Sequence, residues 1–398
     1  MGGAFIMPTV TKVLGVSGGS ISKVDSVEKD DISKLSGASM AAPASAFRVA
    51  MAVGGSGHIL WNTGSLDDVN HWHLLDFSGD VYRDVTWGYD EDGTECWLIA
   101  TNKTAHPLIV ARSDGSSNWV PSSSGDWTNI RPSGGPWTGT WNFRGWRVGR
   151  GDHENNERAT FMMGGMNNSI LSTYVTGGIT DSANWSQYYR AFDDSGTNSA
   201  IHGLSWNRLD DAADSIFALT IGGDVWINTN GTGSGDAGEW TRTYDVSTGT
   251  PWNLQYGNGY FVGGGRNTSG LGTMSGSVGS GKPGDWGLMT NPGTHRAMRS
   301  AATDMSGTWV MCGDDGYVWR STDNAATWSE LNRVPATDGG GTYRDWYDIA
   351  YDNNGTWVMV GERSLATSED GINFTPFDYP TSNQTYHAIA FNVTNTSQ

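Results

Sequence analysis

Cysteine, lysine and long apolar runs are scarce in this sequence of 398 residues. It contains 2 cysteines, 6 lysines and no stretch that approaches the roughly 20 apolar residues of a membrane span. Two cysteines cannot form the disulfide framework of a small secreted domain, so the fold must rest on a packed core. Residues 1–10 also lack the basic region and the apolar core of a signal peptide. We therefore expect neither a membrane span nor export by a signal peptide.

Positive charge is scarce as well. The chain carries 24 Lys and Arg residues against 42 Asp and Glu residues, which gives a net charge of −18. Residues 1–45 contain four lysines and four acids, so the excess of negative charge belongs to the rest of the chain. Because such a field repels a phosphate backbone, we expect no nucleic-acid partner.

What the sequence does contain is a repeat. The phrase GTWVMCGDDGYVWRSTDNAATW begins at Gly307, and GTWVMVGERSLATSEDGINF begins at Gly355, 48 residues later. A period of this length indicates a repeated supersecondary unit. Weaker copies upstream bring the number of units to seven, at about 47–77, 81–119, 137–186, 202–241 and 252–288, with the last two ending at residues 328 and 374.

Each unit has the composition of antiparallel strands, because short runs rich in Val, Ile, Trp, Tyr and Thr alternate with clusters of Gly, Asn, Asp and Ser. Four short strands in about 48 residues match a propeller blade, so residues 46–398 are predicted to form an all-β, seven-bladed β-propeller. The first unit lacks an opening strand, whereas HAIAFN at His387–Asn392 resembles DIAYDN at Asp348–Asn353. We expect this C-terminal strand to complete the first blade and close the ring.

Residues 1–45 are a different kind of sequence. Three similar pieces, TKVLGV, SKVDSV and SKLSGA, place lysines eleven residues apart, and SGASMAAPASAF at residues 36–47 follows as a linker. Pieces of about five residues cannot bury a core of their own. They are interpreted as an extended arm that docks on an assembly partner, the alternative being a flexible polar leader. The residues expected to dock are Lys12, Val13, Ile21, Lys23, Val24, Ile32, Lys34 and Leu35.

The repeated S/T-K-V units of this leader resemble the N-terminal stretches of tailed-bacteriophage structural proteins, where such stretches precede a larger display domain. The resemblance covers about 35 residues. It implies that the chain is located in a virion, that other virion proteins are its partners through the arm, and that it is oligomeric within an assembly.

A second resemblance lies inside the repeats. Residues 321–328, STDNAATW, are similar to the Asp-box, S-x-D-x-G-x-T-W, of sialidase-like propellers, with Ala325 where that family has Gly. Residues 368–374 and 113–119 are looser versions. In that family the box is a hairpin turn whose Asp bonds backbone amides above a packed aromatic ring, which implies a structural role and no catalysis. The residues assigned to these turns are Ser321, Asp323, Trp328, Ser368, Asp370, Phe374, Ser113, Asp114 and Trp119.

Other candidate sites are read as structural. The acidic turn at residues 90–95 lacks the spacing of a calcium loop and is interpreted as a solvated turn. His71 and His73 flank Trp72 on one face of a predicted strand, but no third zinc ligand accompanies them. Residues 151–158 are interpreted as a long loop, and residues 263–281 as a flexible loop with weak strands. No catalytic, metal-binding or cofactor-binding residue is assigned, because no arrangement matches a sialidase-like site.

These observations favour a non-enzymatic structural component of a tailed-phage virion, in the tail or in a tail-fibre or adaptor assembly. Its arm would anchor it, and its propeller would present a docking or host-facing surface, with host surface glycan as a second partner. Two alternatives stay open at this point. One is a sialidase-like or lyase-like enzyme acting on surface polysaccharide, and the other is a glycan-binding propeller without chemistry.

Overall fold

The computed structural model describes residues 23–24, 27–28, 47–77, 79–90, 93–103, 106–116, 118–131, 145–151, 160–165, 170–174, 178–188, 201–207, 216–221, 224–228, 240–245, 249–258, 260–267, 272–278, 286–289, 297–336, 343–378 and 384–393. The chain divides into two compact units, residues 1–46 and residues 47–398. In the first unit, β1 (Lys23–Val24) pairs antiparallel with β2 (Val27–Glu28). The larger unit carries all the remaining strands.

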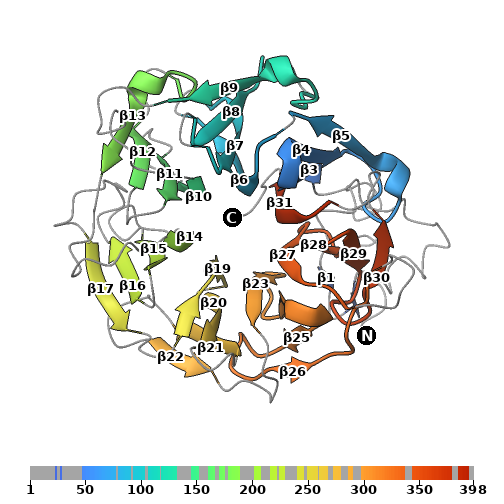
Figure 1. Ribbon diagram of the computed structural model, residues 1–398. Helices are drawn as coiled ribbons and strands as arrows, with labels where there is room; N and C mark the ends of the chain where they lie inside the picture. Colours follow the sequence, from blue (N-terminus) through green and yellow to red (C-terminus); the bar gives the residue numbers. More distant parts are fainter. Residues whose placement is uncertain are drawn as a thin grey trace, which may run out of the picture. The chain divides into compact units, whose positions relative to one another are not determined.

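The described part of the larger unit is all-β and forms seven antiparallel sheets of four or five strands (Figure 1). Five short 3₁₀ turns are the only helical elements described. They are η2 (Gly55–Gly57), η3 (Val69–His71), η4 (Ser124–Asp126), η6 (Ser182–Asn184) and η8 (Asp314–Gly316).

The strands of each sheet follow one another in space from the innermost to the outermost. The first four sheets are β31 (Tyr386–Val393), β3 (Phe47–Gly54), β4 (His58–Asn62) and β5 (Trp72–Asp76); β6 (Tyr82–Tyr89), β7 (Glu95–Thr101), β8 (Leu108–Arg112) and β9 (Trp127–Ile130); β10 (Gly145–Gly151), β11 (Thr160–Gly165), β12 (Ile170–Tyr174) and β13 (Trp185–Tyr188); and β14 (Ile201–Asn207), β15 (Ile216–Ile221), β16 (Asp224–Asn228) and β17 (Trp240–Asp245).

The remaining three sheets have the same order. They are β18 (Gly249–Pro251) with β19 (Gln255–Gly257), then β20 (Tyr260–Asn267), β21 (Gly272–Val278) and β22 (Trp286–Met289); β23 (Met298–Thr303), β24 (Trp309–Gly313), β25 (Val318–Ser321) and β26 (Ser329–Glu330); and β27 (Trp346–Tyr351), β28 (Trp357–Gly361), β29 (Ser364–Ser368) and β30 (Thr375–Asp378).

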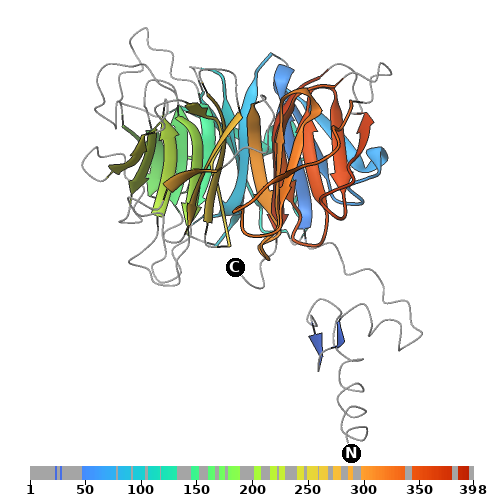
Figure 2. The ribbon, with the colours of Figure 1, turned by 90° about the horizontal axis from the view of Figure 1, so that it is seen from below.

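The innermost strands of neighbouring sheets contact one another in an unbroken series. It runs from β6 through β10, β14, β19, β23, β27 and β31, and β31 contacts β6 again. Figure 1 shows the sheets around a common axis with these strands nearest to it, and Figure 2 shows the same unit edge-on.

The first sheet joins the two ends of the larger unit. β31 pairs antiparallel with β3, so that Met51 lies opposite Ala390 and Val53 lies opposite Ala388. The prediction that the C-terminal strand pairs with the first repeat is therefore confirmed. The second repeat is longer than predicted, because its outermost strand begins at Trp127 and not at Trp119.

The hydrophobic core lies between successive sheets. β7 is buried along its whole length because sheets cover both of its faces. Its side chains alternate: Leu98 packs toward the third sheet and Ile99 packs toward the first. The two cysteines, Cys96 and Cys312, are buried in different sheets and form no disulfide.

The tryptophans that close three of the repeats pack in this core. Trp72, Trp185 and Trp328 are buried, and each donates its indole N–H to a backbone carbonyl of the preceding turn at 2.8–3.1 Å. A buried indole needs such a partner. The late Trp of each of these repeats thus fixes the turn before the outermost strand.

A glycine ends the second strand in three sheets because the neighbouring backbone leaves no room for a side chain. A Cβ on Gly54 would lie 2.1 Å from the carbonyl oxygen of Thr385, and Gly313 and Gly361 face equivalent carbonyl oxygens at 2.3 Å. In each case the next residue donates its N–H to that carbonyl at 2.9 Å. This hydrogen bond ties the second hairpin of the sheet to the start of its innermost strand.

Gly54→Ala should lower the free energy of unfolding by about 1–3 kcal/mol, because the added Cβ forces β3 away from the backbone before β31. The matched control is Gly55→Ala, whose Cβ would lie 3.8 Å from the same oxygen. Denaturant unfolding followed by tryptophan fluorescence measures both. Equal stabilities of the two variants would contradict the steric argument.

Candidate functional site

Every innermost strand has one extra residue near its beginning. In six sheets the pairing register shifts there, which leaves that residue opposite no partner in a β-bulge. The extra residues are Arg83, Trp146, His202, Arg299, Tyr347 and His387. The fifth sheet also has one extra residue. Between the pairs Pro251–Gly265 and Gln255–Val262, the three residues 252–254 lie opposite the two residues 263–264. Trp252 is the residue there that corresponds in position to the extra residues of the other sheets.

These seven residues are called the collar. All are Arg, His or aromatic, although nothing in strand pairing requires those types. The six whose side chains are described are half-buried, whereas the strand residues just before them, such as Met298 and Trp346, are buried. Bulges commonly redirect a side chain next to a functional site. The collar is therefore the candidate functional site.

Four collar residues from consecutive sheets are in contact. The guanidinium of Arg299 lies 4.0 Å from the ring centroid of Trp252 and 5.0 Å from that of Tyr347. Tyr347 meets His387 edge to face, with ring centroids 5.3 Å apart. Such cation–π and aromatic contacts hold planar side chains in fixed orientations.

Arg299 is also held by two carboxylates. Its Nε donates to Asp314 Oδ1 at 2.5 Å, and its Nη2 donates to Asp345 Oδ2 at 3.2 Å. Burial raises the pKa of Asp314, against the opposing effect of Arg299. Burial likewise raises the pKa of Tyr347 to about 12, and its hydroxyl donates to Glu362 Oε1 at 3.3 Å. Tyr347 therefore stays a neutral donor near pH 7.

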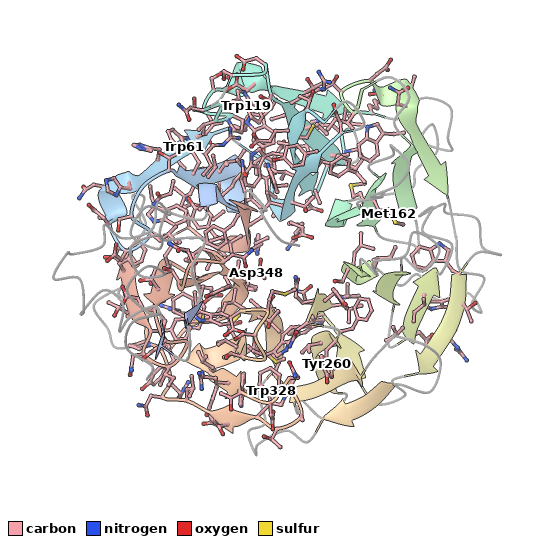
Figure 3. All side chains as sticks on the ribbon, turned by 180° about the vertical axis from the view of Figure 1, so that it is seen from behind. Trp61, Trp119, Met162, Tyr260, Trp328 and Asp348 are labelled. Carbon is pink, nitrogen blue, oxygen red and sulfur yellow. The ribbon has the colours of Figure 1, made fainter. Side chains whose placement is uncertain are left out.

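A belt of hydrogen bonds lies one residue further along the same strands. Asn253 Nδ2 donates to Ser300 Oγ at 2.6 Å, and Ser300 Oγ donates to Asp348 Oδ1 at 2.5 Å. Asp348 Oδ2 accepts the backbone N–H of Ile389 at 2.8 Å. Figure 3 shows Asp348 near the axis. The belt crosses four sheets, so the strands that carry the stacked collar residues are held together by hydrogen bonds.

A second aromatic–arginine cluster adjoins this sector. Arg333 lies 3.7 Å from the ring centroid of Tyr343 and 4.6 Å from that of Tyr317, and its Nε donates to the carbonyl oxygen of Asp315 at 2.8 Å. Asp315 has a positive φ of 52°, and its N–H is accepted by Asp345 Oδ1 at 3.0 Å. Tyr343 is 40 % exposed. The two clusters thus share the turn η8.

A different polar cluster lies at the far ends of the first two sheets. Glu95 is buried, forms an ion pair with Arg48 and accepts hydrogen bonds from Asn392 Nδ2 and from Trp87 Nε1, the latter at 3.0 Å. These contacts connect β3, β6, β7 and β31. They stabilise the junction at which the C-terminal strand meets the second sheet.

Two acids of the turn at residues 90–95, Asp90 and Glu95, are buried, so the interpretation as a solvated turn was wrong for them. Glu91 and Asp92 lie outside the described residues. Asp90 is buried, accepts the N–H of Thr94 at 2.8 Å, and pairs with Arg112 Nε at 2.5 Å. Asp352 accepts the N–H of Thr356 in the same way. The sequence signal was present as D-x-x-G-T, a turn in which the Asp side chain closes the hairpin between the first two strands.

The structure shows the contacts of the assigned Asp-box turn at residues 321–328. Ser321 Oγ donates to Asp323 Oδ1 at 2.7 Å, and Asp323 accepts the backbone N–H and the hydroxyl of Thr327 at 2.9 and 2.6 Å. Ala325 adopts a positive φ of 64° where the related motif has Gly. Trp328 packs below the turn in the core.

The two looser turns differ from each other. Ser368 Oγ donates to Asp370 Oδ1 at 2.9 Å, which also accepts the N–H groups of Ile372 and Asn373 at 2.8 Å, and Phe374 packs against the core. At residues 113–119, Asp114 accepts the N–H of Ser116 at 2.9 Å, Ser113 Oγ accepts the N–H of Gly115 at 3.1 Å, and Trp119 is buried. These turns lie in separate sheets and converge on no common site.

Of the arm residues, the structure places Lys23 and Val24 in β1, opposite Glu28 and Val27. Lys12, Val13, Ile21, Ile32, Lys34 and Leu35 lie outside the described residues, as do most of the loop at residues 151–158 and parts of the stretch 263–281. The described parts of that stretch, residues 263–267 and 272–278, belong to the strands β20 and β21. The docking role of the arm therefore stays a prediction.

The two histidines near Trp72 do not share a strand face. His71 is the last residue of η3, and Asp68 caps the start of η3. Nδ1 of His71 accepts the N–H of Ser65 at 3.0 Å. His73 lies on β5 and packs against Trp61. Among the residues that the structure describes, no cluster of His, Cys, Asp or Glu could hold a metal ion. The described part also contains no helix long and apolar enough to cross a membrane.

The sheets and their arrangement define an all-β protein with a propeller-like fold. Three solved structures with similar folds are YCF48 from Cyanidioschyzon merolae (TM-score 0.51, 13% identity, covering 87% of this chain and 92% of that chain), a streptogramin B lyase (0.52, 13%, 78% and 90%) and a chain of the mitotic checkpoint complex (0.51, 12%, 84% and 85%). At these identities the likeness concerns the fold alone. No protein-family model and no curated protein sequence matches the chain.

The hydrogen bonds to Asp370, led by the Asn373 N–H, lower its pKa well below its usual range. A carboxylate whose pKa is lower in the folded state stabilises the fold above its unfolded pKa of about 4, and this stabilisation is lost as the pH falls. The free energy of unfolding should therefore decline from pH 5 to pH 2 less steeply in Asp370→Asn than in the wild type. The exposed neighbour Glu369→Gln is the control, and an unchanged slope in Asp370→Asn would contradict this role.

Proposed function

We propose that the seven sheets are the blades of one closed seven-bladed propeller, completed by β31, and that this propeller is a non-enzymatic docking platform. Three observations support closure: the unbroken contacts of the innermost strands, the hydrophobic clusters between successive sheets, and the pairing of β31 with β3. Closure leaves no open sheet edge near the axis, so the propeller serves as a rigid support.

The observation that carries the docking role is the collar. Trp, Tyr and Arg are the residue types that dominate binding energy in protein interfaces. Here they occupy equivalent positions on consecutive blades, half-buried and held by one another and by the belt beneath them. Preorganised side chains lose little conformational entropy on binding. A protein partner is therefore the ligand class that this surface supports best.

The sequence of the leader supports the location of this platform in a tailed-phage virion, in a tail, fibre or adaptor assembly. Its repeated S/T-K-V units resemble the leaders of virion structural proteins, and the arm belongs to a compact unit separate from the sheets. In this proposal the arm binds other virion proteins and the collar presents the docking surface. Several copies then assemble through their arms.

Replacing two apolar arm residues, Val13→Asp and Val24→Asp, in the full chain should abolish co-migration with the products of the neighbouring genes in size-exclusion chromatography. Buried apolar anchors do not tolerate a carboxylate. The control variant Ser17→Ala and Ser22→Ala should co-migrate like the wild type, and all chains should share one melting temperature. Co-migration of the Asp variant would overturn the anchoring role.

The enzymatic alternative has its own test. Two carboxylates, Asp314 and Asp345, share Arg299, and the raised pKa of Asp314 is a property of general acids. We expect no release of reducing ends or unsaturated sugars from host envelope polysaccharide incubated with the wild-type chain. The docking role would be wrong, and the protein would be a hydrolase or lyase, if the wild-type chain and the Asp378→Asn variant released such products and the Asp314→Asn variant did not.

A further inference from the structure

We propose that the collar sector of Trp252, Arg299, Tyr347 and His387 binds an extended, uncharged peptide segment of a partner protein, whose carbonyl groups accept hydrogen bonds from Arg299 Nη1. This inference rests on the proposed docking function and specifies the chemistry of the partner. It follows from what the collar leaves exposed and from the charges around it.

The first step concerns the donors of Arg299. Its Nε and Nη2 are engaged by Asp314 and Asp345, whereas Nη1 makes no hydrogen bond to any residue that the structure describes. The side chain of Arg299 is 22% exposed. Two rings and two carboxylates fix the guanidinium plane, so Nη1 is a preoriented donor on a partly exposed side chain.

The second step concerns the aromatic rings. Sugars bind aromatic residues chiefly through an open ring face, but the guanidinium of Arg299 already covers one face of Trp252 and one face of Tyr347. Tyr347 also meets His387 edge to face. A sugar between these rings would have to displace Arg299 from both carboxylates. The stacked arrangement instead presents Arg299 Nη1, a donor that suits the carbonyl groups of a peptide backbone.

The third step concerns charge. The protein carries a net charge of −18, and Arg299 is already neutralised by two carboxylates, so an acidic segment is repelled at long range and finds no unpaired cation here. A basic segment would place its own cation against the donor Nη1. An uncharged segment meets neither penalty. Its binding should be almost independent of ionic strength.

The test uses the full-length chain on an array of 15-residue peptides in three sets, uncharged, acidic and basic, beside an array of host-type glycans. We expect binding to uncharged peptides alone, with affinities that change less than twofold between about 50 and 500 mM salt. Arg299→Lys keeps the charge between the two carboxylates but removes the fork that presents Nη1. It should weaken binding of the best peptide about tenfold or more.

Two variants keep the result interpretable. Arg242→Lys, on β17 with its guanidinium 3.4 Å from Asp224, is a matched substitution away from the four collar residues and should bind like the wild type. Tyr351→Phe, on the same strand as Tyr347 but outside the collar, loses only a hydroxyl group and should also bind normally. Melting temperatures of all variants report whether the fold is intact.

Each other result overturns the inference. Binding restricted to charged peptides or glycans would mean that the partner chemistry is wrong, and an unchanged affinity in Arg299→Lys would mean that the collar is not the site. Absence of binding to every probe would reject the peptide-binding role. The arm experiment is independent of all three results, because it measures co-assembly through residues 1–45, so failure here and failure of the anchoring role are distinguishable.

Discussion

The pairing of β31 with β3 is the constraint on which the rest of the structure depends. It brings together segments more than 330 residues apart in sequence and supplies the innermost strand that the first repeat lacks. Closing so long a loop is entropically costly, and the cost grows only slowly with loop length. Local polar contacts reinforce the junction: Asn392 on β31 donates to the buried Glu95 of the second sheet, which also pairs with Arg48 on β3.

The packing of the described sheets leaves few places where they can meet a ligand. Strands such as β7, β24 and β28 are buried throughout, because neighbouring sheets cover both of their faces. Side chains escape this packing at the bulges of the innermost strands and at the turns. The turns assigned from the Asp-box motif are internally satisfied: the oxygens of Asp323 and Asp370 accept hydrogen bonds from backbone and side-chain groups of their own turns. The collar combines solvent exposure with fixed orientation, which is what recognition requires.

Much of the fold could be predicted from the sequence because its signals are local. The two long repeats, the turn at residues 321–328 and the likeness of His387–Asn392 to Asp348–Asn353 each encode a strand or turn by residue type and spacing. The errors arose where one local pattern has two outcomes. Trp119 and Trp127 both match the aromatic that closes a repeat, and only pairing with β8 shows that the strand begins at Trp127. Asp90 looks solvated in the sequence until the structure places Arg112 beside it.

The candidate site was not predicted, although its residues form a column when the innermost strands are aligned at their bulges. Arg83, His202, Arg299 and Tyr347 share no spacing motif, because a bulge is a property of two paired strands and not of one segment. By itself the sequence determined the repeat, the all-β strands, the turn chemistry and the acidic charge, since these depend on neighbouring residues. Only the tertiary structure decided that Trp252, Arg299, Tyr347 and His387 stack together, because contacts between residues about 40 to 48 positions apart arise when sheets pack side by side.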